Sequence, residues 1–232
     1  MEHRPKNWQE VKDVSITSSR YRWAFLIALS VVILDQVLKI WVKTSFYLGE
    51  EREIFSWFRL SFVENNGMAF GWQFGSKLFL TIFRIVFVGV IVYYLIKLRH
   101  SSGIKFGYLT CVALVLAGAV GNIIDCMFYG IIFSNPFPPE VATIFPEGGG
   151  YAPFLHGRVV DMLSFPLFSF DWPGWMPVIG GKHFEFFKPV FNLADAAISC
   201  GIIAILLFYS KQLGYSFVEL KRIRQEKKNT EQ

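Results

Sequence analysis

Long apolar segments alternate with shorter polar ones along the chain, at a spacing typical of a membrane protein. A helix that crosses the hydrocarbon core needs about 20 mostly apolar residues. Four segments meet this requirement, each with no more than two charged residues: 23–42, 78–96, 106–124 and 190–210. The pattern predicts four transmembrane helices. Because two charges interrupt the first segment and no small-residue cleavage site follows it, we interpret it as a span rather than a signal peptide.

The two longer connections between these segments carry different patterns. In 54–64, apolar and polar residues alternate with a period of two, which predicts a β-strand. The dipeptide Asn66-Gly67 then predicts a turn. The connection 126–189 holds nine of the ten prolines and is rich in Trp and Phe. Such irregular, aromatic sequence is typical of a structure that lies at the membrane–water interface.

Lysine and arginine are distributed unequally around the spans, and this predicts the orientation of the chain. Of the 23 basic residues, 14 lie in the N-terminal tail, the connection between the second and third spans, and the C-terminal tail. Six lie in the two longer connections. Because basic loops remain on the cytoplasmic side, we expect both termini in the cytoplasm and both long connections outside.

The composition supports the membrane class and argues against other classes. Hydrophobic residues make up 53% of the 232 residues and charged residues 18%, whereas a typical soluble domain is about 25% charged. The net charge of +5 is concentrated at span ends, so we interpret it as an orientation signal rather than a nucleic-acid site. The three cysteines contain no CxxC pair and predict no disulfide framework.

Acidic residues in apolar sequence are the strongest functional signal. A carboxylate inside a membrane costs about 2.5–3.5 kcal/mol on insertion scales, so such residues are candidates for function. Four aspartates qualify, and the predicted orientation places all of them in or near the outer half of the membrane: Asp35, Asp125, Asp161 and Asp195. Asn122 precedes Asp125 by three residues, and Asn192 precedes Asp195 by three. This spacing predicts that each pair shares a helix face.

Some of these positions also have a structural interpretation. Asp35 and Lys39 are four residues apart, so they can form an ion pair on one helix. Asp125 can simply end the third span. Gly118 and Gly121 allow a neighbouring helix to approach closely.

Asp161 and Asp195 are harder to explain by structure alone, because Arg158 is the only basic residue within four positions of either. Two carboxylates that meet in a low-dielectric site share a proton, so that one acts as an acid and the other as a base. Such a pair can activate a water molecule and protonate a leaving amine. The residues therefore permit peptide hydrolysis at the membrane surface.

Five sequence blocks resemble the bacterial lipoprotein signal peptidase family (signal peptidase II), whose members are membrane aspartyl proteases. The blocks occur in the family's order: Asp35-Gln36 with Lys39, Asn65 to Gly71, Gly118 to Asp125, Val159 to Asp161, and Phe191 to Asp195. One block alone would say little, but five in order across residues 23–210 make the resemblance specific.

This resemblance implies an all-α membrane protein with four transmembrane helices, a small extracytoplasmic β-cradle and an interfacial loop or helix. It also implies that Asp161 and Asp195 are the catalytic pair. The residues implied to organise the site or bind substrate are Asp35, Lys39, Asn65, Gly67, Asn122 and Asn192. We add Asp125, which lies in one of the matching blocks, as a further candidate. The implied substrate is a prolipoprotein whose cysteine carries diacylglycerol. The enzyme cuts on the N-terminal side of that cysteine and needs no cofactor or metal.

The expected location is the bacterial inner membrane, with the active site at the outer leaflet. We expect a monomer in contact with membrane lipid and without a nucleic-acid partner. The peptidase domain is expected at 23–210, with outer loops at 44–77 and 126–189. Residues 1–22 and 211–232 are expected to be cytoplasmic tails.

Two features depart from the family's pattern. Where the family usually has Arg after the aspartate of the third span, this chain has Cys126. We hypothesise that Arg158, three residues before Asp161, supplies the missing charge. Residues 127–157 and 166–188 are longer than the family commonly carries. They are expected to form extra cover over the site or a rim that alters substrate choice.

Two functions of other classes also fit four spans. A proton-coupled transporter would use intramembrane acids as a relay. It predicts acids across the full depth of the membrane, whereas these cluster on the outer side. A non-catalytic membrane subunit would need only the spans and would tolerate Asp161→Asn without loss of activity or growth.

Overall fold

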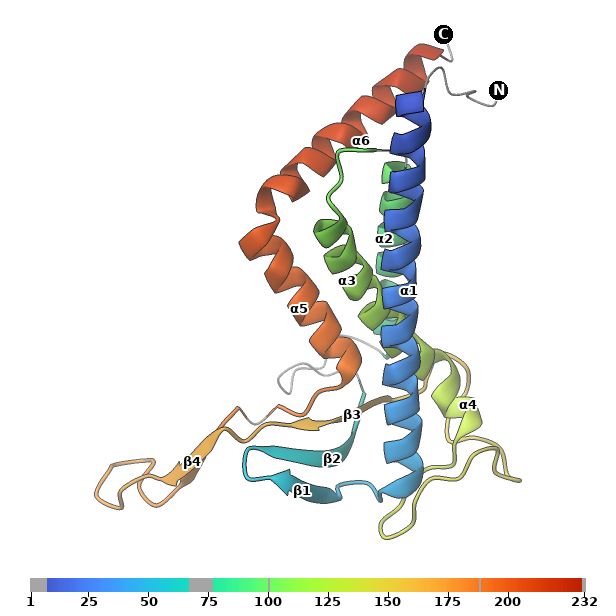
Figure 1. The fold of residues 1–232 in the computed structure, drawn as a ribbon. Helices are drawn as coiled ribbons and strands as arrows, with labels where there is room; N and C mark the ends of the chain where they lie inside the picture. The colour runs from blue at the N-terminus through green and yellow to red at the C-terminus, as the bar shows by residue number, and fades with distance from the viewer. Residues whose placement is uncertain (1–7, 67–76, 100, 188, 231–232) are drawn as a thin grey trace. The chain divides into compact units, whose positions relative to one another are not determined.

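The structure is a computed structural model that describes residues 8–66, 77–99, 101–187 and 189–230. Figure 1 shows the order of its elements along the chain. The helices are α1 (Trp8–Ser45), α2 (Lys77–Leu98), α3 (Phe106–Ile124), the π-helical turn η1 (Asp125–Tyr129), α4 (Gly130–Ile132), α5 (Leu193–Phe208) and α6 (Ser210–Thr230). The strands are β1 (Glu51–Phe55), β2 (Phe58–Asn65), β3 (Val159–Ser164), β4 (Phe168–Asp171) and β5 (His183–Phe186).

Two compact units share these elements. Unit 1 consists of Met1–Leu34, Phe83–Gly121 and Ala194–Gln232. Unit 2 consists of Asp35–Ile82 and Asn122–Leu193. The boundaries fall inside helices α1, α2, α3 and α5, so each of these helices contributes to both units. Unit 1 thus holds helical segments from all four predicted spans, and unit 2 holds both predicted outer loops.

Three helical segments are long and apolar enough to cross a membrane: Ser18–Ser45, Lys77–Leu98 and Phe106–Ile132. The predicted fourth span corresponds to α5 and α6, which are bent by 90° relative to each other and count as one span only as a pair. Helix α5 has 16 residues and is about 24 Å long, somewhat shorter than the hydrocarbon core of about 30 Å. The fold is that of a mostly helical membrane protein with three to four spans and small antiparallel sheets.

The third span is longer than the hydropathy pattern predicts. The apolar segment ends at Ile124, but the helix continues through η1 and α4 to Ile132. Asp125 therefore does not end the helix and is fully buried within it. The extension includes a π-helical turn, a feature that is often found at functional sites.

Unit 1 is held together by close contacts between helices. A Cβ at Gly118 of α3 would lie 2.2 Å from the carbonyl oxygen of Ala194 in α5, so only glycine permits this approach. The prediction made for Gly118 is confirmed. Arg20 donates to the carbonyl of Ile104 (3.3 Å), and Gln212 donates to that of Gly103 (2.9 Å). The N-terminal helix, the α2–α3 connection and α6 thus meet at one end of this unit.

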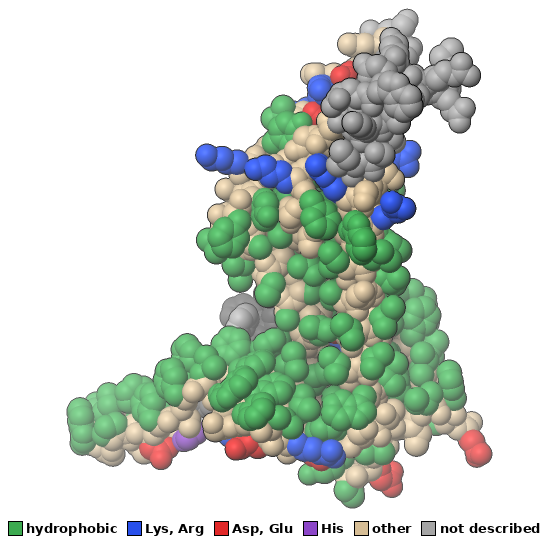
Figure 2. All heavy atoms as spheres, in the orientation of Figure 1, with side chains coloured by type: hydrophobic (Ala, Val, Ile, Leu, Met, Phe, Trp, Pro, Cys, Tyr) green, Lys and Arg blue, Asp and Glu red, His purple; other side chains and the backbone are tan. Residues whose placement is uncertain are grey.

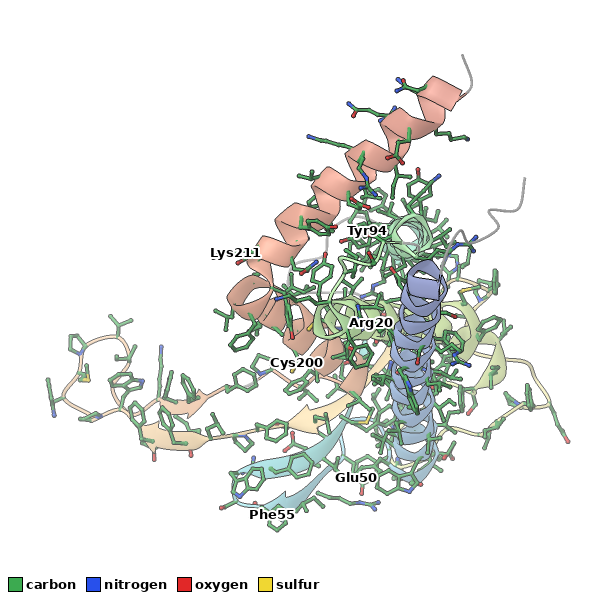
Figure 3. All side chains as sticks on the ribbon, turned by 45° about the horizontal axis from the view of Figure 1, so that its top comes forward. Arg20, Glu50, Phe55, Tyr94, Cys200 and Lys211 are labelled. Atoms are coloured by element: carbon green, nitrogen blue, oxygen red, sulfur yellow. The ribbon has the colours of Figure 1, made fainter. Side chains whose placement is uncertain are left out.

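Hydroxyl groups also link the helices of unit 1. The Tyr94 hydroxyl, on α2, donates to the hydroxyl of Ser216 on α6 (2.6 Å) and is hydrogen-bonded to that of Tyr108 on α3. Figure 3 labels Tyr94 together with Cys200 on α5 and Lys211 at the start of α6. These contacts attach α6 to the helices that precede it in the chain.

Unit 2 is built on a three-stranded antiparallel sheet in the order β1-β2-β3. The single strand predicted over 54–64 is in fact a hairpin, since β1 ends at Phe55 and β2 begins at Phe58. The predicted alternation continues into β2, whose residue Val63 lies opposite Asp161 in β3. Because β2 and β3 come from the two predicted outer loops, their pairing shows that these two segments lie side by side.

The core of unit 2 lies against one face of β3. Val160 and Met162 are buried and pack with Val42 and Phe46 of α1 and with Phe62 of β2. Side chains on a strand alternate between its two faces. Asp161 therefore points to the opposite face from this apolar core.

Candidate active site

A buried lysine gathers three of the predicted site residues in unit 2. Lys39, on α1, is fully buried, and its Nζ lies 2.8 Å from Asp35 Oδ2 and 2.8 Å from Asp125 Oδ2. It also donates to Asn122 Oδ1 over 2.9 Å. A lysine ammonium has three donors, and here each has an acceptor. The predicted Asp35–Lys39 ion pair and the shared orientation of Asn122 and Asp125 are both confirmed.

Asp125 connects this cluster to strand β3. Its Oδ1 accepts a hydrogen bond from Gln36 Nε2 (3.0 Å), and its Oδ2 accepts one from the backbone N–H of Val160 (3.3 Å). Tyr129 donates to Gln36 Oε1 (3.1 Å) and so orients the amide of Gln36. Asp125 thus binds the residue directly before Asp161, which makes it a positioning residue for β3.

Two asparagine amides hold the Asp161 carboxylate. Asp161 is 3% exposed. Asn192 Nδ2 donates to its Oδ1 over 2.7 Å, and Asn65 Nδ2 donates to its Oδ2 over 3.3 Å. Asn192 also donates to the carbonyl of Val160 (3.2 Å). Both carboxylate oxygens therefore have a fixed donor, so the group cannot rotate freely.

The structure places Asn192 outside the helix in which the sequence predicts it. The spacing predicts that Asn192 and Asp195 share a helix face, but α5 begins at Leu193, so Asn192 precedes the helix. Its side chain donates a hydrogen bond to Asp161 Oδ1. Asp195 lies in the first turn of α5 and is partly buried.

The predicted catalytic aspartates belong to different units, Asp161 to unit 2 and Asp195 to unit 1. Their pairing stays a prediction. Gly67, also predicted for the site, lies outside the described residues.

A second charged cluster in unit 2 was not predicted from the sequence. Lys43 is fully buried and forms an ion pair with Glu64 on β2. Arg158 Nη1 lies 2.7 Å from the other oxygen of Glu64 and also donates to Asn135 Oδ1 (2.9 Å). The sequence did contain one indication that Lys43 is buried. Lys43 follows Lys39 by four residues and therefore lies on the same helix face. The partner, Glu64, comes from a distant part of the chain.

Strand geometry explains why neighbouring residues of β2 serve different clusters. Successive side chains on a strand point to opposite faces. Asn65 therefore reaches Asp161, whereas Glu64 points to the other face, where Lys43 and Arg158 lie. The guanidinium of Arg158 binds Glu64. The hypothesis that Arg158 supplies the charge of the family's missing arginine stays a prediction.

Aromatic rings surround this second cluster. Lys43 Nζ lies 5.1 Å from the ring centroid of Tyr151, and the guanidinium carbon of Arg158 lies 4.7 Å from the same centroid. The Tyr151 hydroxyl accepts a hydrogen bond from the backbone N–H of Arg158 (2.6 Å). Burial raises the pKa of the Tyr151 phenol above its usual range. It therefore stays neutral between the two cations and Glu64.

Cys126, at the family's arginine position, is 2% exposed. Its carbonyl accepts a hydrogen bond from Gly157 N–H (2.8 Å). A Cβ at Gly157 would lie 2.0 Å from the carbonyl oxygen of Asp125, so the chain just before β3 packs directly on η1. Within the ranges that the structure describes, no three His, Cys, Asp or Glu side chains form a group that could hold a metal ion.

The sequence matches the family described as signal peptidase (SPase) II over residues 27–211. This match covers most of the chain and contains all the predicted site residues. The chain belongs to the signal peptidase II family. The resemblance inferred from the five sequence blocks is thereby confirmed. The chain is a peptidase, and its span-capable helices make it a membrane protein.

Individual relatives agree with the family assignment. The chain is 50% identical over 188 residues to a lipoprotein signal peptidase of Porphyromonas gingivalis, covering 81% of this chain and 82% of that protein. It is 40% identical over 192 residues to a lipoprotein signal peptidase of Amoebophilus asiaticus, covering 80% and 77%.

Two solved structures of bacterial membrane enzymes are also similar to this signal peptidase II family member. The first has a TM-score of 0.55 at 25% identity and covers 82% of this chain and 88% of that chain. The second has a TM-score of 0.51 at 26% identity and covers 79% and 90%. The predicted fold class is confirmed by these neighbours together with the helices and sheets described above.

Proposed function

We propose that this chain is an aspartyl endopeptidase of the bacterial inner membrane that removes the signal peptide from diacylglyceryl-modified prolipoproteins. It cuts on the N-terminal side of the lipidated cysteine. One observation carries the aspartyl assignment. The Asp161 carboxylate is buried, and amide donors on both of its oxygens orient it on the face of β3 opposite the apolar core. Such preorganisation is what a general acid or base requires.

Asp195 is the proposed partner of Asp161. Asn192, which binds Asp161 directly, precedes Asp195 by only three residues in the chain. Three residues span at most about 11 Å. Chain connectivity therefore supports the pairing. In the reaction, one aspartate takes a proton from water, which attacks the scissile carbonyl. The other donates a proton to the developing oxygen and later to the leaving amine.

The charge distribution supports an orientation with both termini in the cytoplasm. Figure 2 shows Lys and Arg side chains gathered at one end of unit 1. The hydrogen bonds of Arg20 and Gln212 bring the N-terminal helix, the α2–α3 connection and α6 together at that end. Because such basic clusters remain cytoplasmic, the loops that carry β1, β2 and β3 lie outside. Cleavage then occurs at the outer leaflet, and the diacylglyceryl chains remain in the bilayer.

The test is cleavage of a purified diacylglyceryl-modified prolipoprotein by the full chain, followed as a shift to the shorter product. Asp161→Asn and Asp195→Asn are each expected to lower the rate by about 10²–10⁴-fold, the range for loss of an acid–base group. Asp171→Asn is the matched control, because Asp171 is exposed on β4 and has His183 as its partner. The unlipidated precursor is expected to remain uncut.

Two other outcomes would contradict the proposed function. If both asparagine variants cut at the wild-type rate, the catalytic pair is misassigned, and Asp35 and Asp125 become the next acids to test. If the wild type does not cut the lipidated precursor, the peptidase assignment is wrong for this substrate. A transport assay then tests the proton-coupled alternative.

A further inference from the structure

Strands β4 and β5 form a two-stranded ribbon whose two faces differ sharply in chemistry. The register pairs Phe168 with Phe186 and Phe170 with Phe184. Because directly opposed residues point to the same face, four phenylalanines share one face. The other face carries Ser169 and the ion pair between Asp171 and His183, whose atoms lie 2.7 Å apart.

The rings of the apolar face pack closely on one another. Phe168 and Phe186 stack with centroids 4.7 Å apart, and Phe170 lies 5.1 Å from Phe184 and 4.9 Å from Trp172. Even so, Phe168 remains 53% exposed and Phe170 40%. The rings therefore contact one another while part of their surface stays uncovered by the described part of the chain.

The tip of the ribbon is more exposed than its phenylalanine face. Trp172 and Lys182 continue the ladder beyond β4 and β5, since the Trp172 N–H donates to the carbonyl of Lys182 (3.0 Å). Between them, Trp175 is 82% exposed and Val178 is 88% exposed. An isolated two-stranded ribbon is at best marginally stable in water. We therefore expect the exposed apolar face and tip of this ribbon to contact another apolar surface.

The lipid bilayer is an apolar surface available to the ribbon, because the chain contains helices that can span a membrane. The ribbon begins four residues after β3 ends at Ser164 and ends seven residues before α5 begins at Leu193. The ribbon is therefore joined at one end to β3 and at the other, through a short segment, to the start of α5, an apolar helix of the proposed fourth span. In Figure 2, hydrophobic side chains line one side of this arm, and acidic and histidine side chains line the opposite side. Trp and other aromatic residues concentrate at membrane–water interfaces, and one charged face matches the aqueous side.

We propose that the phenylalanine face of the β4–β5 ribbon, with Trp175 and Val178 at its tip, binds the interface of the lipid bilayer. The polar face with Asp171 and His183 then remains in water. The ribbon is an in-plane anchor that lies within the long 166–188 segment. The proposal depends on the chain crossing a membrane and not on the peptidase mechanism.

The test measures the depth of a nitroxide spin label on each face of the ribbon. Single cysteines are introduced as Phe170→Cys and Ser169→Cys in a Cys200→Ser background, because Cys200 is exposed whereas Cys111 and Cys126 are buried. The full chain is placed in nanodiscs of phosphatidylethanolamine and phosphatidylglycerol. Power saturation then reports access to oxygen, which enriches in the bilayer, and to a water-soluble nickel complex.

The label at position 170 is expected to show higher oxygen access and lower nickel access than the label at 169. Val178→Cys provides a second apolar site, because this exposed tip residue can be replaced without removing a ring from the phenylalanine face. Equal nickel access at 169 and at both apolar sites would overturn the proposal. Spin–spin broadening at position 170 would assign the face to a second copy instead. Exclusion of both reagents from all three sites would assign it to protein contacts, which also overturns the proposal.

Discussion

The two compact units bury different chemistry. Among the described residues, the buried polar side chains of unit 1 are Ser101, Ser216 and Glu219, and its core is otherwise formed by apolar residues and tyrosines. Among the described residues of unit 2, six charged side chains are buried: Asp35, Lys39, Lys43, Glu64, Asp125 and Asp161. Unit 1 is thus packed as a helix bundle usually is, whereas unit 2 encloses a polar interior.

This difference indicates which unit carries the constraints of function. A buried ion pair often contributes no more stability than well-packed apolar residues of the same volume. Small residues that permit close helix contact, by contrast, are what helix association in a membrane uses. The buried charges of unit 2 therefore fit the chemistry proposed at β3, and the glycine contacts of unit 1 fit helix packing. Three substitutions test this contrast between the two units.

The largest effect is expected for Lys39→Met in unit 2. The change removes the cation and leaves Asp35 and Asp125 buried without it. Loss of one partner from a buried pair costs about 3–5 kcal/mol. The free energy of unfolding in detergent, measured by denaturant titration, reports this loss.

Two comparisons make the Lys39 result specific. Lys97→Met, at the C-terminal end of α2, removes a lysine of the same size and is expected to change stability by less than about 1 kcal/mol. Combining Lys39→Met with Asp35→Asn and Asp125→Asn is expected to restore most of the loss, because no unpaired charge remains. A triple variant as unstable as Lys39→Met alone would show that packing, not charge, explains the effect.

A smaller effect is expected for Gly118→Ala in unit 1. The new methyl group would lie 2.2 Å from the backbone carbonyl oxygen of Ala194, and backbone cannot move aside as a side chain can. Overpacking of this kind costs about 1–3 kcal/mol. Gly89→Ala is the matched control, since a Cβ at Gly89 meets nothing within 4 Å. This control is expected to keep or slightly raise the melting temperature, because alanine favours the helix. Equal losses from both variants would contradict the packing argument.

The smallest effect on stability is expected for Arg158→Ala. Its guanidinium is partly exposed, and Glu64 keeps Lys43 as a partner, so the loss is about 1 kcal/mol or less. If Arg158 supplies the charge that Cys126 lacks, cleavage of the lipidated precursor falls about tenfold, equivalent to 1.4 kcal/mol. Arg59→Ala, which removes a partly exposed arginine from the same sheet, is expected to leave cleavage unchanged. Full activity of Arg158→Ala would reject the hypothesis.

Local patterns in the sequence predicted a large part of this protein. The spans follow from hydropathy, because the thickness of the bilayer dictates a length of apolar helix. The Asp35–Lys39 pair follows from helix periodicity, and the close approach at Gly118 follows from the missing side chain. The motif around Asp161 was also recognisable, since an acidic residue in apolar sequence is rare unless it has a function.

Contacts between distant residues were decided only by the tertiary structure. The pairing of β2 with β3 brings Asn65 to Asp161 and Glu64 to the opposite face, although neither strand indicates its partner. The start of α5 at Leu193 frees Asn192 to bind Asp161. Periodicity describes the neighbours of a residue along its own helix or strand. A hydrogen bond across 31 residues depends on the path of the chain between them, and that path is chosen by packing of the whole unit.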